Sequence, residues 1–168
     1  MHEVERDGAA AHGASPVIEG FVKRYYAEIF RYCQWHTVDR ASAEDATQET
    51  FLKFIRFSDR FDERGKTRAF LYRIAQNTCT DLMRKRPMEA LPDNAAYEEK
   101  GFLHAETSVD AQAFLGVLDE EQRELILLRF VQDLSFREIA GITGVPMRTV
   151  QTRIRKALGR MRAAERGR

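Results

Sequence analysis

The chain of 168 residues is long enough for one ordinary domain or two small ones, and its 43% hydrophobic content suffices for a packed core. Charged residues make up 32% of the chain but are mixed in sign, so the formal net charge is only +1. No run of about 20 apolar residues occurs, which excludes a predicted membrane-spanning helix.

The N-terminal residues 1–16 lack the basic start and the apolar core of a secretory signal. Their polar, Ala- and Gly-rich composition predicts a disordered tail. The two cysteines, Cys33 and Cys79, lie far apart in the sequence and suggest no disulfide framework. A reduced, cytoplasmic protein is therefore expected.

Helical periodicity begins at Val17, where apolar residues step along one face of a helix that ends near His36. A second helix is predicted to start after Ser42, as its N-cap, and to run to about Phe57. The side opposite its apolar face carries a small acidic patch with one leucine, formed by Asp45, Gln48, Glu49 and Leu52. From the residues alone, a solvated helix surface is the favoured interpretation of this patch.

A polar loop follows from Ser58 to Thr67, and a third helix from Arg68 to Arg86, which Pro87 ends. The loop and the start of this helix interleave aromatic rings with cations, among them Arg60, Phe61, Arg64, Lys66, Arg68, Tyr72 and Arg73. Unpaired bases stack on rings while their phosphates meet cations, so the pattern is typical of single-stranded nucleic-acid binding. Aromatic residues that cap the core among solvated cations explain it equally well.

The composition shifts over residues 88–108, where proline, glycine, alanine and acidic residues indicate a flexible acidic linker. This linker is expected to divide the chain into domains at residues 17–87 and 109–168. In the second domain, helices are predicted from Val109 to Leu118 and from there to Gln132, with Asp119 as the cap of the latter. Leu125, Leu128 and Phe130 are expected to face the helices that follow. Since no strand pattern is found, the predicted fold is all-α, with a second domain of four helices.

Residues 135–161 have the pattern of a helix-turn-helix. A short helix from Phe136 to Thr143 is followed by Gly144, which tolerates a left-handed backbone, and Pro146 is expected to open the second helix. From Pro146 to Arg168 there are eight Arg or Lys residues against one Glu, a segregation of charge that indicates phosphate binding. Duplex DNA binding is the favoured interpretation, and an ordinary helical hairpin with a solvated basic face is the alternative.

Motifs of enzymes are missing from the sequence: it has no glycine-rich phosphate loop, no G-x-S-x-G and no H-E-x-x-H. Cys33 and His36 lie at a helical spacing that could hold a metal, but a zinc site requires four ligands. We therefore predict no catalytic residue, no metal and no cofactor. A metal-dependent enzyme or sensor built on this pair is one alternative.

Three blocks together resemble a bacterial sigma-70 family RNA polymerase sigma factor of the extracytoplasmic-function (ECF, group 4) type. They are D-A-T-Q-E-T-F at residues 45–51, R-A-F-L-Y-R-I-A-x-N at residues 68–77, and the helix-turn-helix. The resemblance covers residues 17–86 and 109–162. It implies two small helical domains, a region 2 bundle over residues 17–87 and a region 4 helix-turn-helix domain over residues 109–168.

The resemblance implies a non-enzymatic initiation factor in the bacterial cytoplasm, which binds core RNA polymerase, directs it to promoters and assists DNA melting. The acidic patch would bind the β′ clamp helices of the polymerase, and the β flap is a second expected contact. Promoter DNA and an anti-sigma factor are further expected partners, and no membrane insertion is expected. The alternative is a conventional helix-turn-helix regulator of duplex operators, although no dimerisation helix follows the motif.

The resemblance also implies roles for individual residues. The −10 element would be bound as an unpaired strand by Arg60, Phe61, Arg64, Lys66, Tyr72, Asn77, Asp81, Arg84 and Arg86. The −35 element would be read as duplex by Arg148, Gln151, Thr152, Arg155 and Lys156, with Arg153 at a phosphate. The family commonly has glycine in place of Arg148 and a cation in place of Gln151. The −35 preference is therefore open, and Gln151 could select adenine.

Overall fold

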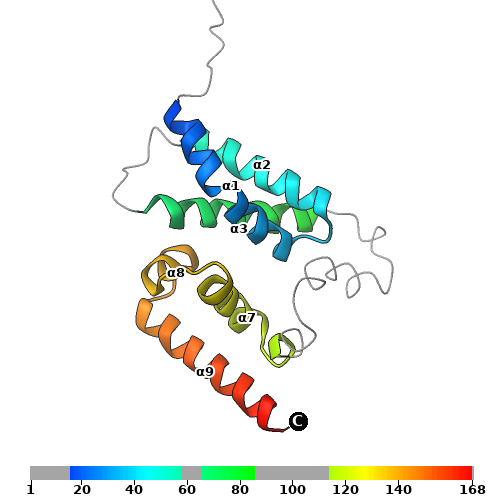
Figure 1. The fold of residues 1–168 in the computed structure, drawn as a ribbon, viewed down its shortest axis with the longest axis vertical. Coiled ribbons are helices and arrows are strands. Elements are labelled where there is room, and N and C mark those ends of the chain that lie inside the picture. The colour runs from blue at the N-terminus through cyan, green and yellow to red at the C-terminus, as the bar shows by residue number, and fades with distance from the viewer. Residues whose placement is uncertain (1–15, 58–65, 86–113, 168) are drawn as a thin grey trace, which may run out of the picture.

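The computed structural model describes residues 16–57, 66–85 and 114–167. Throughout this part the chain is helical and contains no strand, which confirms the predicted all-α fold (Figure 1). The predicted N-terminal tail and acidic linker lie outside the described residues. So do four of the residues predicted to bind the −10 element, which are Arg60, Phe61, Arg64 and Arg86.

The N-terminal bundle consists of α1 (Pro16–His36), α2 (Arg40–Phe57) and α3 (Thr67–Lys85), which pack against one another. The ends of α1 and α3 agree with the sequence prediction to within a residue or two. The start of α2 was predicted too late, because its cap is Asp39 rather than Ser42. The Asp39 carboxylate accepts a hydrogen bond from the backbone N–H of Ser42 at 2.7 Å, so the helix begins with Arg40.

The core of this bundle combines aromatic rings with threonines. Phe21 and Phe54 stack with their ring centroids 4.4 Å apart. Thr47 and Thr50 are fully buried on α2, and their hydroxyls donate to the carbonyls one turn earlier at 2.7 and 2.6 Å. Each buried hydroxyl is therefore satisfied within its own helix, and the rest of the side chain packs as an apolar group.

The C-terminal bundle begins with α7 (Glu120–Ile126), whose predicted cap Asp119 accepts from the Gln122 N–H at 2.8 Å. The helix then continues as a π-helical turn, η3 (Leu127–Val131), instead of the regular helix expected to Gln132. The wider turn changes the rotation of the side chains that follow. Leu125 and Leu128 are buried as expected, but Phe130 is 56% exposed, so the expectation that it faces the helix-turn-helix is wrong.

The helix-turn-helix consists of α8 (Phe136–Thr143) and α9 (Met147–Arg166). A capping box joins Ser135 and Glu138 at the start of α8, and Gly144 ends it with the predicted left-handed backbone, at φ 70°. Pro146 stands as the N-cap of α9 instead of its first helical residue. A residue lacking an N–H fits both positions, because neither needs to donate within the helix.

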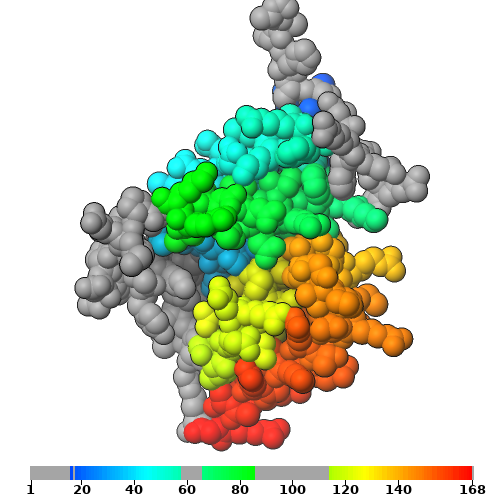
Figure 2. Space-filling model, turned by 180° about the vertical axis from the view of Figure 1, so that it is seen from behind, coloured from blue at the N-terminus to red at the C-terminus, as the bar shows by residue number. Residues whose placement is uncertain are grey.

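The two bundles lie directly against each other. α3 packs on α8, while α7 packs on α9, as the ribbon shows (Figure 1). Seen from behind, the surface of α3 meets that of the α7 and α8 segments (Figure 2). Buried residues from both bundles form one continuous apolar core, including Leu71 on α3 and Ile139 on α8. Sequence reasoning left the relative placement of the two parts open, and the structure supplies it.

Candidate nucleic-acid interface

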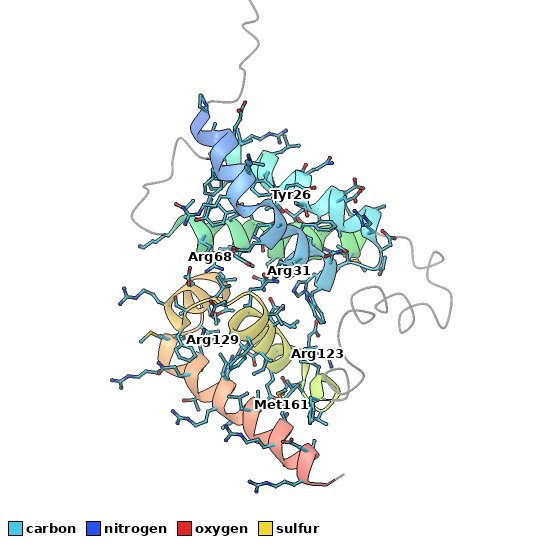
Figure 3. The ribbon with its side chains drawn as sticks, in the orientation of Figure 1. Tyr26, Arg31, Arg68, Arg123, Arg129 and Met161 are labelled. Atoms are coloured by element: carbon cyan, nitrogen blue, oxygen red, sulfur yellow. The ribbon has the colours of Figure 1, made fainter. Side chains whose placement is uncertain are left out.

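The outer face of α9 is the most clearly exposed group of predicted DNA-binding residues. Four of them have exposed side chains and Gln151 is half-buried; the exposed ones are Arg148, Thr152, Arg155 and Lys156. The opposite face inserts Val150, Ile154 and Ala157 into the core. Figure 3 shows the extended side chains of α9 on the side turned away from the N-terminal bundle. The helix can therefore present polar groups to a groove while its apolar face holds it on the domain.

Arg153 on α9 serves a different contact in this structure. Its guanidinium pairs with Glu121 on α7. Two helical turns further, Arg160 donates to Gln122 at 2.8 Å and lies 3.2 Å from Asp119. Both cations tie α9 to the start of α7, so a phosphate would have to compete with carboxylates for them. A phosphate contact of Arg153 stays a prediction.

The acidic patch on α2 is assembled as the sequence suggested. Asp45 and Gln48 are exposed, Leu52 is 51% exposed, and Glu49 lies 3.7 Å from Lys53 on the same helix. Because these positions are spaced by three or four residues, they share one face of α2. The patch thus presents carboxylates around one exposed apolar side chain, a combination that suits a basic helical partner.

The described residues predicted for the −10 element fall into two groups. Lys66, Asn77 and Arg84 are exposed, and Arg84 pairs with Asp81. Tyr72, in contrast, is fully buried between the bundles, where its hydroxyl donates to the Gln132 side-chain oxygen at 2.9 Å. Burial raises the pKa of this phenol, so it is neutral and acts as a hydrogen-bond donor. Tyr72 is not accessible to DNA in this arrangement.

The structure gives Arg68 a role that sequence reasoning did not assign to it. Its side chain lies at the junction between the two bundles. It lies at the boundary between α3 and α8 (Figure 3). Its guanidinium donates to Glu28 of α1 at 2.6 Å and to the Gln132 carbonyl at 2.9 Å, and approaches Glu138 of α8 at 3.5 Å. Burial acts to lower the pKa of Arg68, but the hydrogen bond and the negative charge of Glu28 outweigh it, so the pKa is raised. Arg68 therefore keeps its positive charge.

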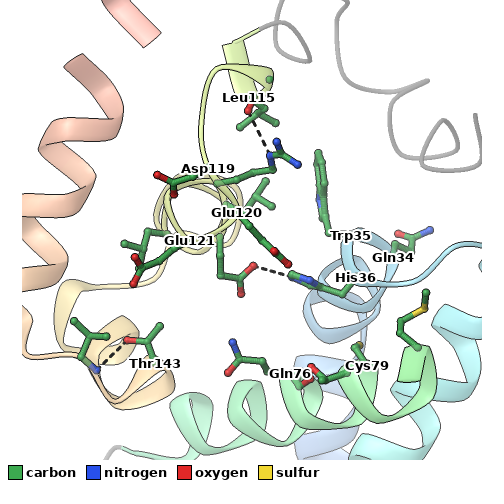
Figure 4. A pocket seen from close by; sticks show the side chains of 18 residues that line it. Gln34, Trp35, His36, Gln76, Cys79, Leu115, Asp119, Glu120, Glu121 and Thr143 are labelled. Carbon is green, nitrogen blue, oxygen red and sulfur yellow. Dashed lines mark hydrogen bonds and ion pairs between the residues drawn. The ribbon is translucent and has the colours of Figure 1, made fainter. Parts of the chain in front are cut away.

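A cavity of about 1040 Å³ lies between the two bundles (Figure 4). His36 on α1 points across it toward Glu124 on α7, with 3.0 Å between the ring nitrogen and the carboxylate. The hydroxyl of Tyr32 donates to the same carboxylate at 2.9 Å. Burial, together with this carboxylate, raises the pKa of Tyr32. Glu124 thus receives two contacts from the other bundle.

The cysteine and histidine considered as metal ligands face different surroundings. Cys33 is buried against Cys79 of α3, and both are free thiols, whereas His36 faces Glu124. Within residues 16–57, 66–85 and 114–167, no group of three or more His, Cys, Asp or Glu side chains could hold a metal ion. None of the helices in these ranges is long and apolar enough to cross a membrane.

Comparisons with known proteins agree with the geometry. The family model for Sigma-70 region 2 matches residues 21–87, and that for Sigma-70 region 4 matches residues 108–161. The chain is 31% identical over 155 residues to the ECF RNA polymerase sigma factor SigC of Mycobacterium tuberculosis, covering 89% of this chain and 83% of that relative. It is 27% identical over 161 residues to the ECF RNA polymerase sigma factor SigW of Bacillus subtilis, covering 86% of each chain.

Two solved structures share the arrangement of helices. CnrH in complex with the cytosolic domain of CnrY is 26% identical, with a TM-score of 0.69 over 92% of this chain and 91% of that one. The sigma factor RpoE in complex with the anti-sigma factor NepR, from Bartonella quintana, is 20% identical and shows a similar fold. Its TM-score is 0.65, over 90% of this chain and 98% of that one.

Proposed function

This chain belongs to the extracytoplasmic-function group of the sigma-70 family of RNA polymerase sigma factors, and we propose that it directs core polymerase to promoters through −10 and −35 elements and assists their melting. Residues 17–87 would act as region 2 and residues 109–168 as region 4. Such a protein would work beside the polymerase in the bacterial cytoplasm. The family is not a class of enzymes, so the chemistry of RNA synthesis would belong to the polymerase.

The outer face of α9 is the observation that carries this proposal. Arg148, Thr152, Arg155 and Lys156 are exposed on a helix that follows a capped α8 and a left-handed glycine. Arginine can donate two hydrogen bonds to guanine in the major groove, while half-buried Gln151 can bind adenine in the same bidentate way. The −35 element would therefore be read as duplex by this face.

Melting at the −10 element would use the other bundle. Lys66, Asn77 and Arg84 are exposed on or beside α3 and can contact phosphates and base edges of a separated strand. Capture of an unpaired base offsets part of the free energy of opening, so no nucleotide hydrolysis is needed. The polymerase would meet the acidic patch of α2 through the β′ clamp helices and the C-terminal bundle through the β flap.

An anti-sigma factor is a further proposed partner. Two chains of similar fold were solved in complexes, one with the cytosolic domain of CnrY and one with the anti-sigma factor NepR. Such a partner would control access to the polymerase-binding and DNA-binding faces.

In vitro transcription tests the proposed function directly. The purified chain is mixed with core polymerase and genomic fragments, and specific transcripts are mapped. Transcripts that begin at a shared promoter sequence, and that require both core polymerase and this chain, are expected. A conventional operator-binding regulator would instead bind duplex DNA and would not direct core polymerase to start specific transcripts. The absence of co-purification with core enzyme would contradict the proposal.

A further inference from the structure

Helix α9 is longer than the groove that its N-terminal half is expected to read. Its 20 residues span about 30 Å at a rise of about 1.5 Å per residue. The major groove of duplex DNA is only about 12 Å wide. If Arg148 and Arg155 lie in the groove, the C-terminal half of α9 must pass one wall of the groove, which is a phosphate backbone. The match to the region 4 model ends at residue 161, within this half.

The arginines of α9 form two rows along the helix. One row, which we call the open row, consists of Arg148, Arg155, Arg162 and Arg166. The other, which we call the paired row, consists of Arg153 and Arg160. A spacing of seven residues is about two turns, and one of four is about one turn, so the members of each row share a face. Five residues separate Arg148 from Arg153, so the two rows lie about 140° apart around the helix.

The two rows differ in their surroundings. In the paired row, Arg153 pairs with Glu121 of α7, and Arg160 lies 3.2 Å from Asp119. The open row has exposed side chains throughout, and its guanidinium groups make no hydrogen bond or ion pair with another residue in the described part of the chain. Glu165, the one acidic residue of α9, lies about 100° around the helix from the nearest member of the open row. The positive charges of the open row are therefore available to an external anion.

A glycine interrupts the open row where no internal contact requires one. Gly159 lies between Arg155 and Arg162 on the same face of a regular helix. Apart from the backbone of its own turn, a Cβ atom built there would meet nothing in the described part of the chain within 4 Å. Glycine in the middle of a helix is less stable than alanine, so packing within the chain gives no reason for it. The close approach of another molecule's backbone to the helix gives one.

We propose that the C-terminal half of α9 binds the phosphate backbone beside the −35 element, with Arg162 and Arg166 contacting phosphates and Gly159 as the point of closest approach. The inference rests on the proposed function and deepens it. From Arg155 to Arg162 the helix rises about 10 Å, so Arg155 can reach a base while Arg162 lies at the edge of the groove. Phosphate contacts fix the position of the helix and add affinity that falls with salt, but they select no sequence.

The salt dependence of duplex binding tests the two arginines. The purified full chain is titrated against a fluorescein-labelled duplex of arbitrary sequence and about 30 base pairs, and anisotropy is read between about 50 and 200 mM salt. Arg162→Ala with Arg166→Ala should reduce the slope of log K against log salt by about 1–2, since each phosphate contact contributes about 0.9. Arg153→Ala with Arg160→Ala is the matched control, because it removes the same charge from the same helix. Its slope should change far less.

Gly159→Leu tests the close approach without removing a charge. Leucine has a higher helix propensity than glycine, so thermal melting should show a chain at least as stable as the unmodified one. The added side chain would hold the phosphate backbone away from the helix, so the affinity for the duplex should fall severalfold. A glycine with no role in binding would leave that affinity unchanged, and this result would overturn the proposal.

The remaining outcomes separate the inference from the proposed function. Equal changes in slope for the two double variants would identify general electrostatic attraction and overturn the inference. So would an unchanged slope for Arg162→Ala with Arg166→Ala, and if that variant also failed to co-purify with core polymerase, the open row would bind protein instead of DNA. Specific transcription by the unmodified chain would leave the proposed function intact in either case. The expected slopes without any specific transcript would contradict the proposed function and leave the phosphate contacts standing.

Discussion

Replacing Arg68 with alanine should lower the free energy of unfolding by about 2 kcal/mol. The guanidinium donates to the Gln132 carbonyl at 2.9 Å, and hydrogen bonds from charged groups contribute about 1.5–3 kcal/mol. Its pairs with Glu28 at 2.6 Å and Glu138 at 3.5 Å add about 0.2–1 kcal/mol each. Because the side chain is 26% exposed, the lower end of each range applies.

Urea denaturation followed by circular dichroism measures this loss. Arg73→Ala is the matched control, because Arg73 is an exposed cation on the same helix, and it should change stability by no more than about 0.5 kcal/mol. Adding Glu138→Gln to each variant completes a double-mutant cycle that isolates the contact between the bundles. Equal losses for Arg68→Ala and Arg73→Ala would refute the assignment of Arg68 as a junction.

Three further predictions concern the DNA, polymerase and capping contacts. Arg155→Ala should weaken binding to −35 duplex by about 1–3 kcal/mol if it contacts a base, and electrophoretic mobility shifts that show equal losses on unrelated duplexes would identify a phosphate contact instead. Asp45→Arg with Glu49→Arg should abolish co-purification with core polymerase while the circular dichroism spectrum is retained; unchanged co-purification would exclude the patch as a docking face. Burial acts to raise the pKa of Glu138, but the hydrogen bonds from Ser135 outweigh it and the pKa is lowered. The stability that Glu138 contributes is therefore present above its unfolded pKa of about 4.3, and it is lost as the pH falls through the lower pKa of the folded state. Glu138→Gln, which keeps a capping side chain, should therefore flatten part of the acid decline in unfolding free energy, and an identical pH profile would contradict this.

Sequence reasoning succeeded where the determinants of structure are local. The bounds of α8 agree with prediction because Ser135 and Glu138 cap its start and Gly144 ends it. The two faces of α9 likewise follow from three- and four-residue spacing within one helix, so Val150 is buried and Arg155 exposed. No distant residue is needed to specify either feature.

The failures have long-range or irregular causes. In the sequence, Arg68 could not be distinguished from the other cations around it. Its acceptors come from α1 and from the segment after η3, which are 40 and 64 residues away in sequence. The hydrogen bond of Tyr72 to Gln132 was missed, because it depends on the placement of the C-terminal bundle, and a contact of Tyr72 with the −10 element stays a prediction. The π-helical turn of η3 breaks the regular periodicity on which the expectation for Phe130 depended.

The absence of a side chain at Gly141 lets α8 lie directly against Ala69 of α3, so the packing of the two bundles depends on a position of minimal size. One or two added methyl groups at this position would change how the bundles pack without replacing any residue of the acidic patch on α2 or of the outer face of α9. The placement of the two bundles and the chemistry of their exposed faces can therefore vary independently in sequence.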